Sequence, residues 1–225
     1  MHIEPGIVDG AKMGLAVVTA TGVGAYTAKA AWDDIRHNGT AALALRAALA
    51  TVGTFVFFEV LPHFAVGVSE VHFILGTTLF LILGLAPAAI GLAAGLLIQG
   101  MFFAPSDLPM FFVNVTTLLV PLFGIFALSK RVIAPQTAYV DLSYGQALKL
   151  SAAYQGGVVA WVAFWAIYGQ GVGAENLSNV AAFGAAYMLV VLIEPLADLA
   201  VLAGAKALRR LDGSPFVTPR LHNAA

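Results

Sequence analysis

The sequence contains no cysteine and little charge. Because cysteine is absent from all 225 residues, the chain can form neither a disulfide framework nor a thiolate metal site. Charged residues make up only 10% of the chain, whereas about 25% is usual in soluble domains. The formal net charge of -1 excludes the strongly basic surface by which proteins bind nucleic acid. Any metal ion must therefore be held by nitrogen or oxygen atoms.

Hydrophobic residues, in contrast, make up 60% of the chain and gather in long runs. A helix needs about 20 apolar residues to cross the hydrocarbon of a membrane, and helices satisfy their backbone groups within one segment. The sequence therefore predicts an all-α polytopic membrane protein, a bundle of about seven transmembrane helices surrounded by lipid. The predicted spans are residues 13–31, 41–61, 71–86, 87–104, 109–129, 147–168 and 179–205.

Lys and Arg residues are concentrated at alternate connections between these spans. The ten that share one side are Lys29, Arg36, Arg46, Lys130, Arg131, Lys149, Lys206, Arg209, Arg210 and Arg220. The connections on the other side, near residues 62–70, 105–108 and 169–178, contain none, and Lys12 is the exception. Because cytoplasmic loops carry the excess of cations, we expect the N-terminus outside and the C-terminus in the cytoplasm. Residues 1–205 then form one transmembrane domain, and residues 206–225 a cytoplasmic tail.

This orientation divides the five histidines into two groups. His2, His63 and His72 are predicted at the outer face, whereas His37 and His222 are predicted at the inner face. A single metal site cannot combine members of both groups, so a site at the outer face has three histidines to draw on.

The first two residues offer the most compact set of nitrogen donors in the chain. The amine of Met1, the amide nitrogen of His2 and Nδ1 of its imidazole can close two fused chelate rings on one ion. Such a nearly planar set suits Ni(II) and Cu(II), and accommodates Co(II), better than it suits tetrahedral Zn(II). The chelate requires a free Met1 amine, and an imidazole in the fourth position would complete it.

Two alternatives weaken this interpretation of the chain start. A Met-His dipeptide can simply be a disordered terminus. Cleavage at Ala28-Lys29-Ala30, which fits the end of a secretory signal, would remove the chelate altogether. Glu4 and Asp9 argue against such a signal, because its first residues are normally positive.

Other polar residues lie within or beside the spans. Glu59 and His63, four residues apart at the outer end of the second span, are either a secondary metal pair or an interfacial polar pair. Glu194 and Asp198 lie in the last span, where ionisable groups usually face the bundle interior or a partner. Arg46 enters the second span from the same cytoplasmic side, so we predict an Arg46–Asp198 ion pair.

The first span also carries a stripe of small residues at four-residue spacing, which would let another helix approach closely. Its members are Ala16, Ala20, Gly24 and Ala28. The stripe predicts close packing, either inside the bundle or against a partner membrane subunit.

Several motifs together resemble one family. The opening Met1-His2-Ile3-Glu4-Pro5-Gly6, the element Ser69-Glu70-Val71-His72, Leu97-Ile98-Gln99 and Asn114-Val115 follow one another in that order. This order and spacing are similar to those of the CbiM/NikM family, the cobalt and nickel substrate-binding subunits of energy-coupling factor transporters. The resemblance covers residues 1–125; beyond them only hydropathy and span count agree. One departure is Met110-Phe111-Phe112-Val113, where the family usually has small residues.

The resemblance implies a function and a site. The chain would capture Co²⁺ or Ni²⁺ outside the cell as a multi-pass protein of the inner (plasma) membrane. Loop 1–12 would fold into the transmembrane domain. Met1 and His2 would bind the ion, His72 would be the fourth ligand, at the outer end of a helix, and Gln99 and Asn114 would hold the loop.

The resemblance also implies partners. A transmembrane coupling subunit and two cytoplasmic ATPase subunits would supply the energy, since this chain has no phosphate-binding G-x-x-x-x-G-K-[ST] motif. The chain itself would then not be an enzyme. The alternatives are an intramembrane metal-dependent hydrolase, although no H-E-x-x-H motif is present, and a stand-alone carrier, although no inverted repeat is evident.

Overall fold

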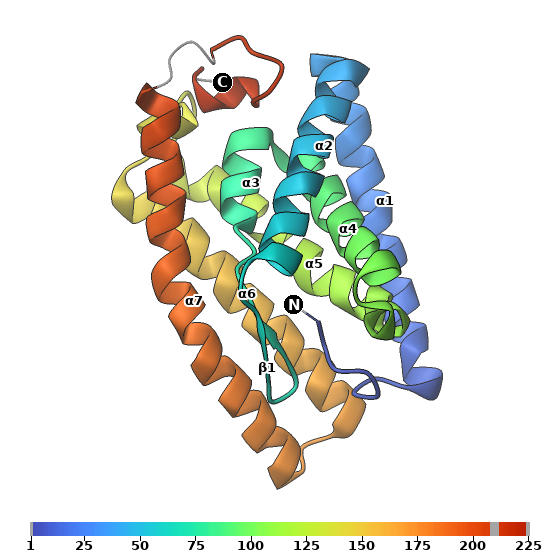
Figure 1. The fold of residues 1–225 in the computed structure, drawn as a ribbon. Helices are drawn as coiled ribbons and strands as arrows, with labels where there is room; N and C mark the ends of the chain where they lie inside the picture. The colour runs from blue at the N-terminus through green and yellow to red at the C-terminus, as the bar shows by residue number, and fades with distance from the viewer. Residues whose placement is uncertain (1, 208–211, 224–225) are drawn as a thin grey trace.

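The computed structural model describes residues 2–207 and 212–223 and is almost entirely helical. The α-helices in this part of the chain are α1 Met13–Asn38, α2 Thr40–Phe55, α3 Gly76–Leu83, α4 Leu85–Phe102, α5 Phe111–Val132, α6 Tyr144–Gln170 and α7 Ala174–Ala207. The strands β1 Phe64–Val66 and β2 Ser69–Val71 form an antiparallel hairpin between α2 and α3. Short helical turns are η1 Gly10–Lys12, η2 Val56–Val60, η3 Pro105–Met110, η4 Tyr139–Asp141 and η6 Pro219–Leu221. Figure 1 shows the helices as one bundle with the hairpin in front of α6 and beside α7.

The prediction of an all-α membrane protein is confirmed, but the number of spans is not. Within the described residues, five helices are long and apolar enough to cross a membrane: Thr40–Val60, Leu85–Phe102, Pro105–Val132, Tyr144–Gln170 and Ala174–Ala207. The orientation of the bundle in the membrane stays a prediction, and two of the cations behind it, Arg209 and Arg210, lie outside the described residues.

The predicted span at residues 71–86 is wrong. Residues 69–71 belong to β2, and the helix that follows, α3, has only eight residues. Such a helix is about 12 Å long, far short of the roughly 30 Å of membrane hydrocarbon. It ends at Gly84, whose φ of 98° is unfavourable for other residues. Pro87 lies in the first turn of α4, where its missing N–H breaks no helical hydrogen bond.

Helices α2 and α4 pack most closely, because small residues line their contact. A Cβ atom placed on Gly91 would lie 2.2 Å from the Cβ of Ala50, and one on Gly95 would lie 2.6 Å from a methyl group of Thr54. The stripe of small residues predicted on the first span, now part of α1, is not packed closely along its whole length. Ala16 is buried, but Gly24 has open space where a Cβ would lie and borders an apolar surface groove between α1, α4 and α5.

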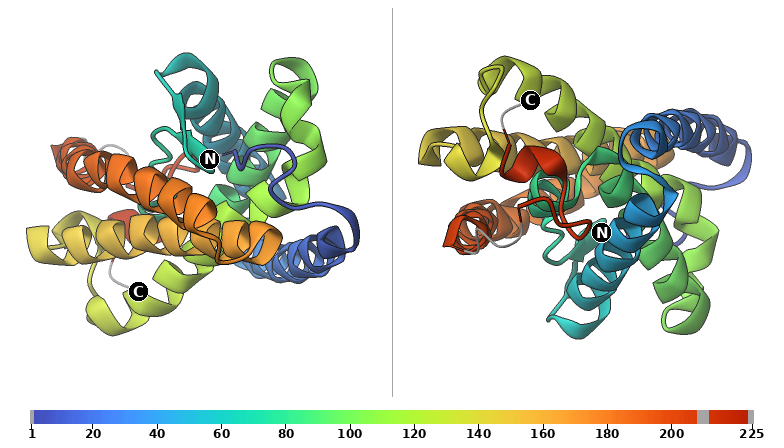
Figure 2. Two further views of the ribbon diagram at one scale, coloured as in Figure 1. Left: turned by 90° about the horizontal axis from the view of Figure 1, so that it is seen from below. Right: turned by 90° about the horizontal axis from the view of Figure 1, so that it is seen from above.

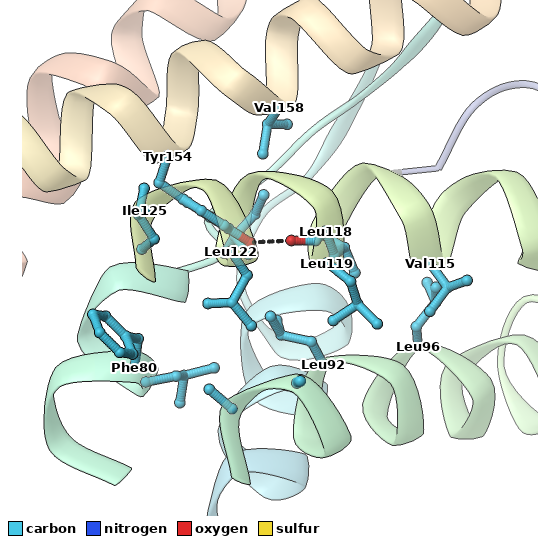
Figure 3. Packing of buried hydrophobic residues seen from close by; sticks show 14 of the residues in the cluster. Phe80, Leu92, Leu96, Val115, Leu118, Leu119, Leu122, Ile125, Tyr154 and Val158 are labelled. Carbon is cyan, nitrogen blue, oxygen red and sulfur yellow. Dashed lines mark hydrogen bonds between the residues drawn. The ribbon is translucent and has the colours of Figure 1, made fainter. Parts of the chain in front are cut away.

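Helix α5 carries the centre of the hydrophobic core. Its residues Leu118, Leu122 and Ile125 pack among Phe80 of α3 and Leu92 of α4 (Figure 3). From the other side α6 contributes Tyr154, whose hydroxyl donates to the Leu118 carbonyl over 3.4 Å. The burial of these side chains fixes α3, α4 and α6 around α5.

The predicted Arg46–Asp198 ion pair is wrong. Arg46 is 1% exposed, and its Nη2 donates to Oδ1 of Asp34 over 2.6 Å, while Nη1 donates to the Leu83 carbonyl over 2.7 Å. Asp198 accepts a hydrogen bond from Thr78 of α3. The reason is the tight turn at Gly39, which brings Asp34 of α1 beside Arg46 of α2.

The C-terminal residues 212–223 pack against the end of the bundle where α1 meets α2 (Figures 1 and 2). The Thr218 amide donates to the Ile82 carbonyl over 2.8 Å, and Leu221 is fully buried. His222 lines a cavity there with Asn38 and Arg46. His37 also lies at this end, beside Lys130 and Arg220.

Candidate metal centre

The chain start runs beside β2 as a third, irregular strand. Ile3 forms a bridge with Ser69, the Glu70 amide donates to the His2 carbonyl over 3.0 Å, and the Ser69 hydroxyl donates to the same carbonyl over 3.0 Å. The Glu4 amide donates to the Val68 carbonyl over 3.2 Å. These bonds join residues nearly 70 positions apart in the sequence. They fix the imidazole of His2 next to the hairpin.

Two helices hold the rest of the N-terminal loop. The buried Ile3 donates its amide to Oδ1 of Asn114 in α5 over 2.8 Å, so the structure places Asn114 directly against the loop. On α6, Gln170 donates to the Gly6 carbonyl over 2.8 Å. Gly169 approaches so closely that a Cβ there would lie 1.9 Å from the Ile7 carbonyl oxygen. Motif comparison identified Asn114 but neither residue of α6.

The hairpin sets the position of His72. Its turn contains Gly67, with a φ of 61°, and a Cβ on this residue would lie 2.1 Å from the Asn179 carbonyl oxygen of α7. The expectation that His72 stands at the end of a helix is wrong, because it directly follows strand β2. Side chains two residues apart in a strand point to the same side. Glu70 and His72 therefore face the same space.

His2, Glu70 and His72 form one cluster of side chains of the metal-ligating type. One ligand atom from each lies within 4.8 Å of the others. Oε2 of Glu70 is 2.8 Å from Nδ1 of His2, and the two imidazole centroids are 5.6 Å apart. His2 and His72 are 3% and 2% exposed, so both imidazoles are shielded from solvent. Met1, whose amine belongs to the predicted chelate, lies outside the described residues.

Hydrogen bonds occupy one ring nitrogen of each imidazole. Nδ1 of His72 lies 3.2 Å from the Phe73 carbonyl oxygen, which can only accept, so this nitrogen carries the proton and Nε2 is the acceptor nitrogen of the ring. Nδ1 of His2 likewise faces the Glu70 carboxylate, and within the described residues its buried Nε2 makes no hydrogen bond.

The electrostatics agree with a neutral imidazole beside an ionised carboxylate. Burial lowers the pKa of His2. Burial also raises the pKa of Glu70, but the hydrogen bond from His2 opposes it, and the pKa of this carboxyl falls below its ordinary value. Burial and the nearby charges of Glu70 and Asp107 raise the pKa of Glu4. The site thus places the ionised Glu70 carboxylate, with Asp107 nearby, beside the neutral imidazole of His2.

Phe58 packs against the cluster, whereas Gln99 bonds to Glu59. The Phe58 ring centroid is 4.5 Å from that of His72 and 6.0 Å from that of His2, so an apolar ring covers one side. Gln99 is buried, and its Nε2 donates to Oε2 of Glu59 over 3.3 Å. Within the described residues, the Gln99 side chain makes no other hydrogen bond, and it therefore makes none to loop 1–12.

Among the described residues, no hydrogen bond or ion pair joins Glu59 to His63. Glu59 lies in the π-helical turn η2 and faces Gln99, whereas Nδ1 of His63 lies 3.3 Å from the Leu61 carbonyl. The helix ends at Val60, and Leu61 is extended with a ψ of 153°, so the two side chains do not share a helical face. Neither belongs to the cluster of His2, Glu70 and His72.

Sequence reasoning missed two acidic residues of the site. In the sequence Glu70 stands out only as a member of the motif Ser69-Glu70-Val71-His72, and nothing marks Asp107 of η3, although its Oδ2 lies 3.9 Å from Nδ1 of His2. The two-residue spacing of Glu70 and His72 could have indicated that both side chains face one site. This spacing has that meaning only if the segment is a strand.

A second buried polar cluster holds the segment after His72. Oε1 of Glu194 in α7 accepts hydrogen bonds from the amides of Ile74, over 2.5 Å, and Leu75, over 3.1 Å. Its Oε2 accepts from Gln155 of α6, whose own oxygen accepts from the Tyr187 hydroxyl over 2.7 Å. Leu75 has a φ of 51°, unusual for its type, and these bonds stabilise it. Helices α6 and α7 thus fix the backbone two residues beyond His72.

The comparison with protein families decides the identity of this arrangement. A family model described as CbiM, the cobalt uptake substrate-specific transmembrane region, matches residues 2–210. The chain belongs to this family. The match includes every residue of the cluster, and with the apolar helices it makes the chain a transmembrane component of cobalt uptake. Neither a curated protein nor a solved structure matches this CbiM-family chain.

Proposed function

We propose that this CbiM-family chain captures a divalent transition-metal ion, Co²⁺ or Ni²⁺, as the substrate-binding subunit of an energy-coupling factor transporter. The observation that carries the proposal is the buried cluster of His2, Glu70 and His72, formed by the chain start and the hairpin. Two imidazoles beside carboxylates offer a divalent ion donors and compensating charge.

The proposed nitrogen donors are those predicted from the chain start together with His72. The amine of Met1, the amide nitrogen and Nδ1 of His2, and Nε2 of His72 would surround the ion. Because Nδ1 of His2 now faces Glu70 at 2.8 Å, the ion must replace this hydrogen bond when it binds. Asn114 supports the site by holding the Ile3 amide, immediately after the proposed ligands.

Energy is proposed to come from other subunits, and the chain itself is proposed not to be an enzyme. Without a phosphate-binding motif it needs a coupling subunit and two ATPases for active import. The distribution of Lys and Arg supports an inner-membrane orientation with the N-terminus outside and the C-terminus in the cytoplasm. The metal site would then face the source of the ion.

A binding measurement tests the site. Metal bound by the purified full-length protein would be compared for the wild type, His2→Ala, and a variant with three Gln residues inserted after Met1. The insertion preserves every side chain but moves the imidazole too far from the terminal amine to close the fused chelate rings, so both variants should lose high-affinity binding. His63→Ala is the matched control, because His63 lies outside the cluster. Binding that survives the insertion would contradict the chelate, and a hydrolase site would tolerate it.

An uptake measurement tests the transporter class. Cells would express the chain with or without a coupling subunit and ATPases, and accumulation of radioactive cobalt would be followed. Uptake that requires the partners supports the proposal. Full uptake by the chain alone would identify a stand-alone carrier.

A further inference from the structure

We propose that Glu70 is itself a ligand of the transported ion and that this carboxylate shifts the preference of the site from Ni²⁺ towards Co²⁺. The inference rests on the proposed function and deepens it, because it adds an oxygen donor to a set of nitrogen donors. It concerns a residue that motif comparison did not assign to the site.

The position of Glu70 matches that of a metal ligand. Two donors that lie about 2.1 Å from one ion at a right angle are separated by about 3 Å. Oε2 of Glu70 and Nδ1 of His2 are already 2.8 Å apart, and the ligand atoms of all three residues lie within 4.8 Å of one another. An ion can therefore take both atoms as neighbouring ligands with small movements.

The backbone favours the same role. Glu70 and His72 are two residues apart and face one side of the β2 segment, and the Glu70 amide is bonded to the His2 carbonyl. The backbone of Glu70 is thus fixed to the residue that supplies the chelate. A carboxylate placed by such a bond cannot move far from the ion that His2 binds.

Charge gives a reason for an acidic ligand. A divalent ion held by buried neutral groups is costly unless anionic groups compensate its charge. His2 and His72 are nearly fully buried, whereas the Glu70 side chain is 23% exposed. Glu70 can therefore reach the ion from the solvent side of the cluster and carry its charge to it.

Asp107 makes a useful contrast with Glu70. It carries the same charge and approaches the same His2 nitrogen, but at 3.9 Å rather than 2.8 Å, and it does not belong to the group whose ligand atoms all lie within 4.8 Å of one another. Asp107 comes from the separate turn η3 and has no backbone bond to the chain start among the described hydrogen bonds. It adds negative charge near the site without being a ligand.

The expected ion preference follows from coordination geometry. A planar set of nitrogen atoms favours Ni²⁺ and Cu²⁺. A carboxylate oxygen as an additional ligand raises the coordination number and removes part of that advantage. Loss of Glu70 should therefore reduce the affinity for Co²⁺ more than the affinity for Ni²⁺.

The experiment compares Glu70→Gln with Asp107→Asn in the purified full-length protein. The Gln side chain has the same length and can still accept the hydrogen bond from His2, so it tests the charged ligand rather than the shape. Dissociation constants for Co²⁺ and Ni²⁺ and the visible absorption spectrum of bound Co²⁺ would be measured. We expect Glu70→Gln to weaken Co²⁺ binding about 100-fold, to raise the Ni²⁺-over-Co²⁺ preference about tenfold and to change the spectrum. Asp107→Asn should weaken binding of both ions less than about tenfold with an unchanged spectrum.

Two outcomes would overturn the ligand role. The first is equal behaviour of the two variants. The second is weaker binding by Glu70→Gln with an unchanged Co²⁺ spectrum, which would make Glu70 a positioning residue for His2. His2→Ala separates this inference from the proposed function. If His2→Ala retains full binding, the proposed site is wrong; if it loses binding while Glu70→Gln retains it, only the inference about Glu70 is wrong.

Discussion

The two buried polar clusters of this protein differ in how their hydrogen bonds are satisfied. In the cluster of His2, Glu70 and His72, contributions come from the chain start and a short hairpin, and Nε2 of His2 makes no hydrogen bond within the described residues. In the cluster around Glu194, both carboxylate oxygens are bonded, and the side chains come from the long helices α6 and α7. A hydrogen bond between two side chains of the metal-ligating type, such as that of His2 with Glu70, can be replaced by an ion, whereas a carboxylate bonded to backbone amides suits a cluster that holds the backbone in place.

The largest expected effect is a loss of metal binding when the cluster of His2, Glu70 and His72 loses a ligand. His72→Ala should weaken binding of Co²⁺ at least about 100-fold, because it removes a proposed ligand. His63→Ala, a change of the same kind outside the cluster, should leave binding unchanged. Isothermal titration with Co²⁺ measures both variants. Tight binding by His72→Ala would show that the metal site lies elsewhere.

Glu194→Ala should act mainly on stability. The substitution leaves the buried amides of Ile74 and Leu75 and the Gln155 side chain without their acceptor, which should cost about 3 kcal/mol. Thermal unfolding of the metal-free protein in detergent measures the loss. Glu194→Gln is the control, because its amide oxygen can still accept from the two backbone groups, and its loss should be smaller. Equal unfolding temperatures for wild type and Glu194→Ala would show that the Glu194 cluster does not stabilise the fold.

Gly67→Ala tests how the hairpin is fixed to α7. Its Cβ would collide with the Asn179 carbonyl and the residue would keep a φ of 61°, so we expect a loss of about 2 kcal/mol and weaker metal binding. Gly213→Ala is a matched control, since Gly213 has a similar φ of 72° but nothing within 4 Å of an added Cβ. Thermal unfolding and isothermal titration with Co²⁺ measure both variants. If the two variants lose equal stability, the contact with α7 contributes nothing.

Asn114→Ala should have the smallest effect of the series. It leaves the buried Ile3 amide without its acceptor, a cost of about 1 kcal/mol or about a fivefold loss of metal affinity. Asn114→Asp keeps an acceptor oxygen and should retain most of the affinity. An Asp variant that binds as weakly as the Ala variant would show that this hydrogen bond does not hold the loop.

The sequence predicted the helices that depend on local composition. The apolar runs at 87–104, 109–129, 147–168 and 179–205 correspond to α4, α5, α6 and α7, because each run alone is long enough to be stable in lipid. The run at 71–86 was misread, since its first residues pair with a chain start almost 70 positions away. A pairing over that distance leaves no periodic trace in a local window.

Part of the candidate site could also be predicted from the sequence, namely its two histidines but not its acidic residues. His2 and His72 were placed together by topology and family resemblance, and the structure brings their rings to 5.6 Å. Glu70 and Asp107 were missed, because their relevance depends on the strand register and on the fold of η3. The predicted partner of Arg46, Asp198, was wrong for a similar reason. Two residues at the same depth in a membrane need not be neighbours, and the turn at Gly39 places Asp34 beside Arg46 instead.

The C-terminal residues 212–223 change how the end of the bundle where α1 meets α2 should be regarded. Helix α3 stops within the bundle, and the carbonyls of its last residues, Ile82 and Leu83, are bonded by the Thr218 amide and by Arg46. Residues 217–221 therefore act as the missing continuation of a half-length helix, supplied from the far end of the chain. Truncating them would be equivalent to cutting into the membrane domain, and fusion proteins should be joined beyond them.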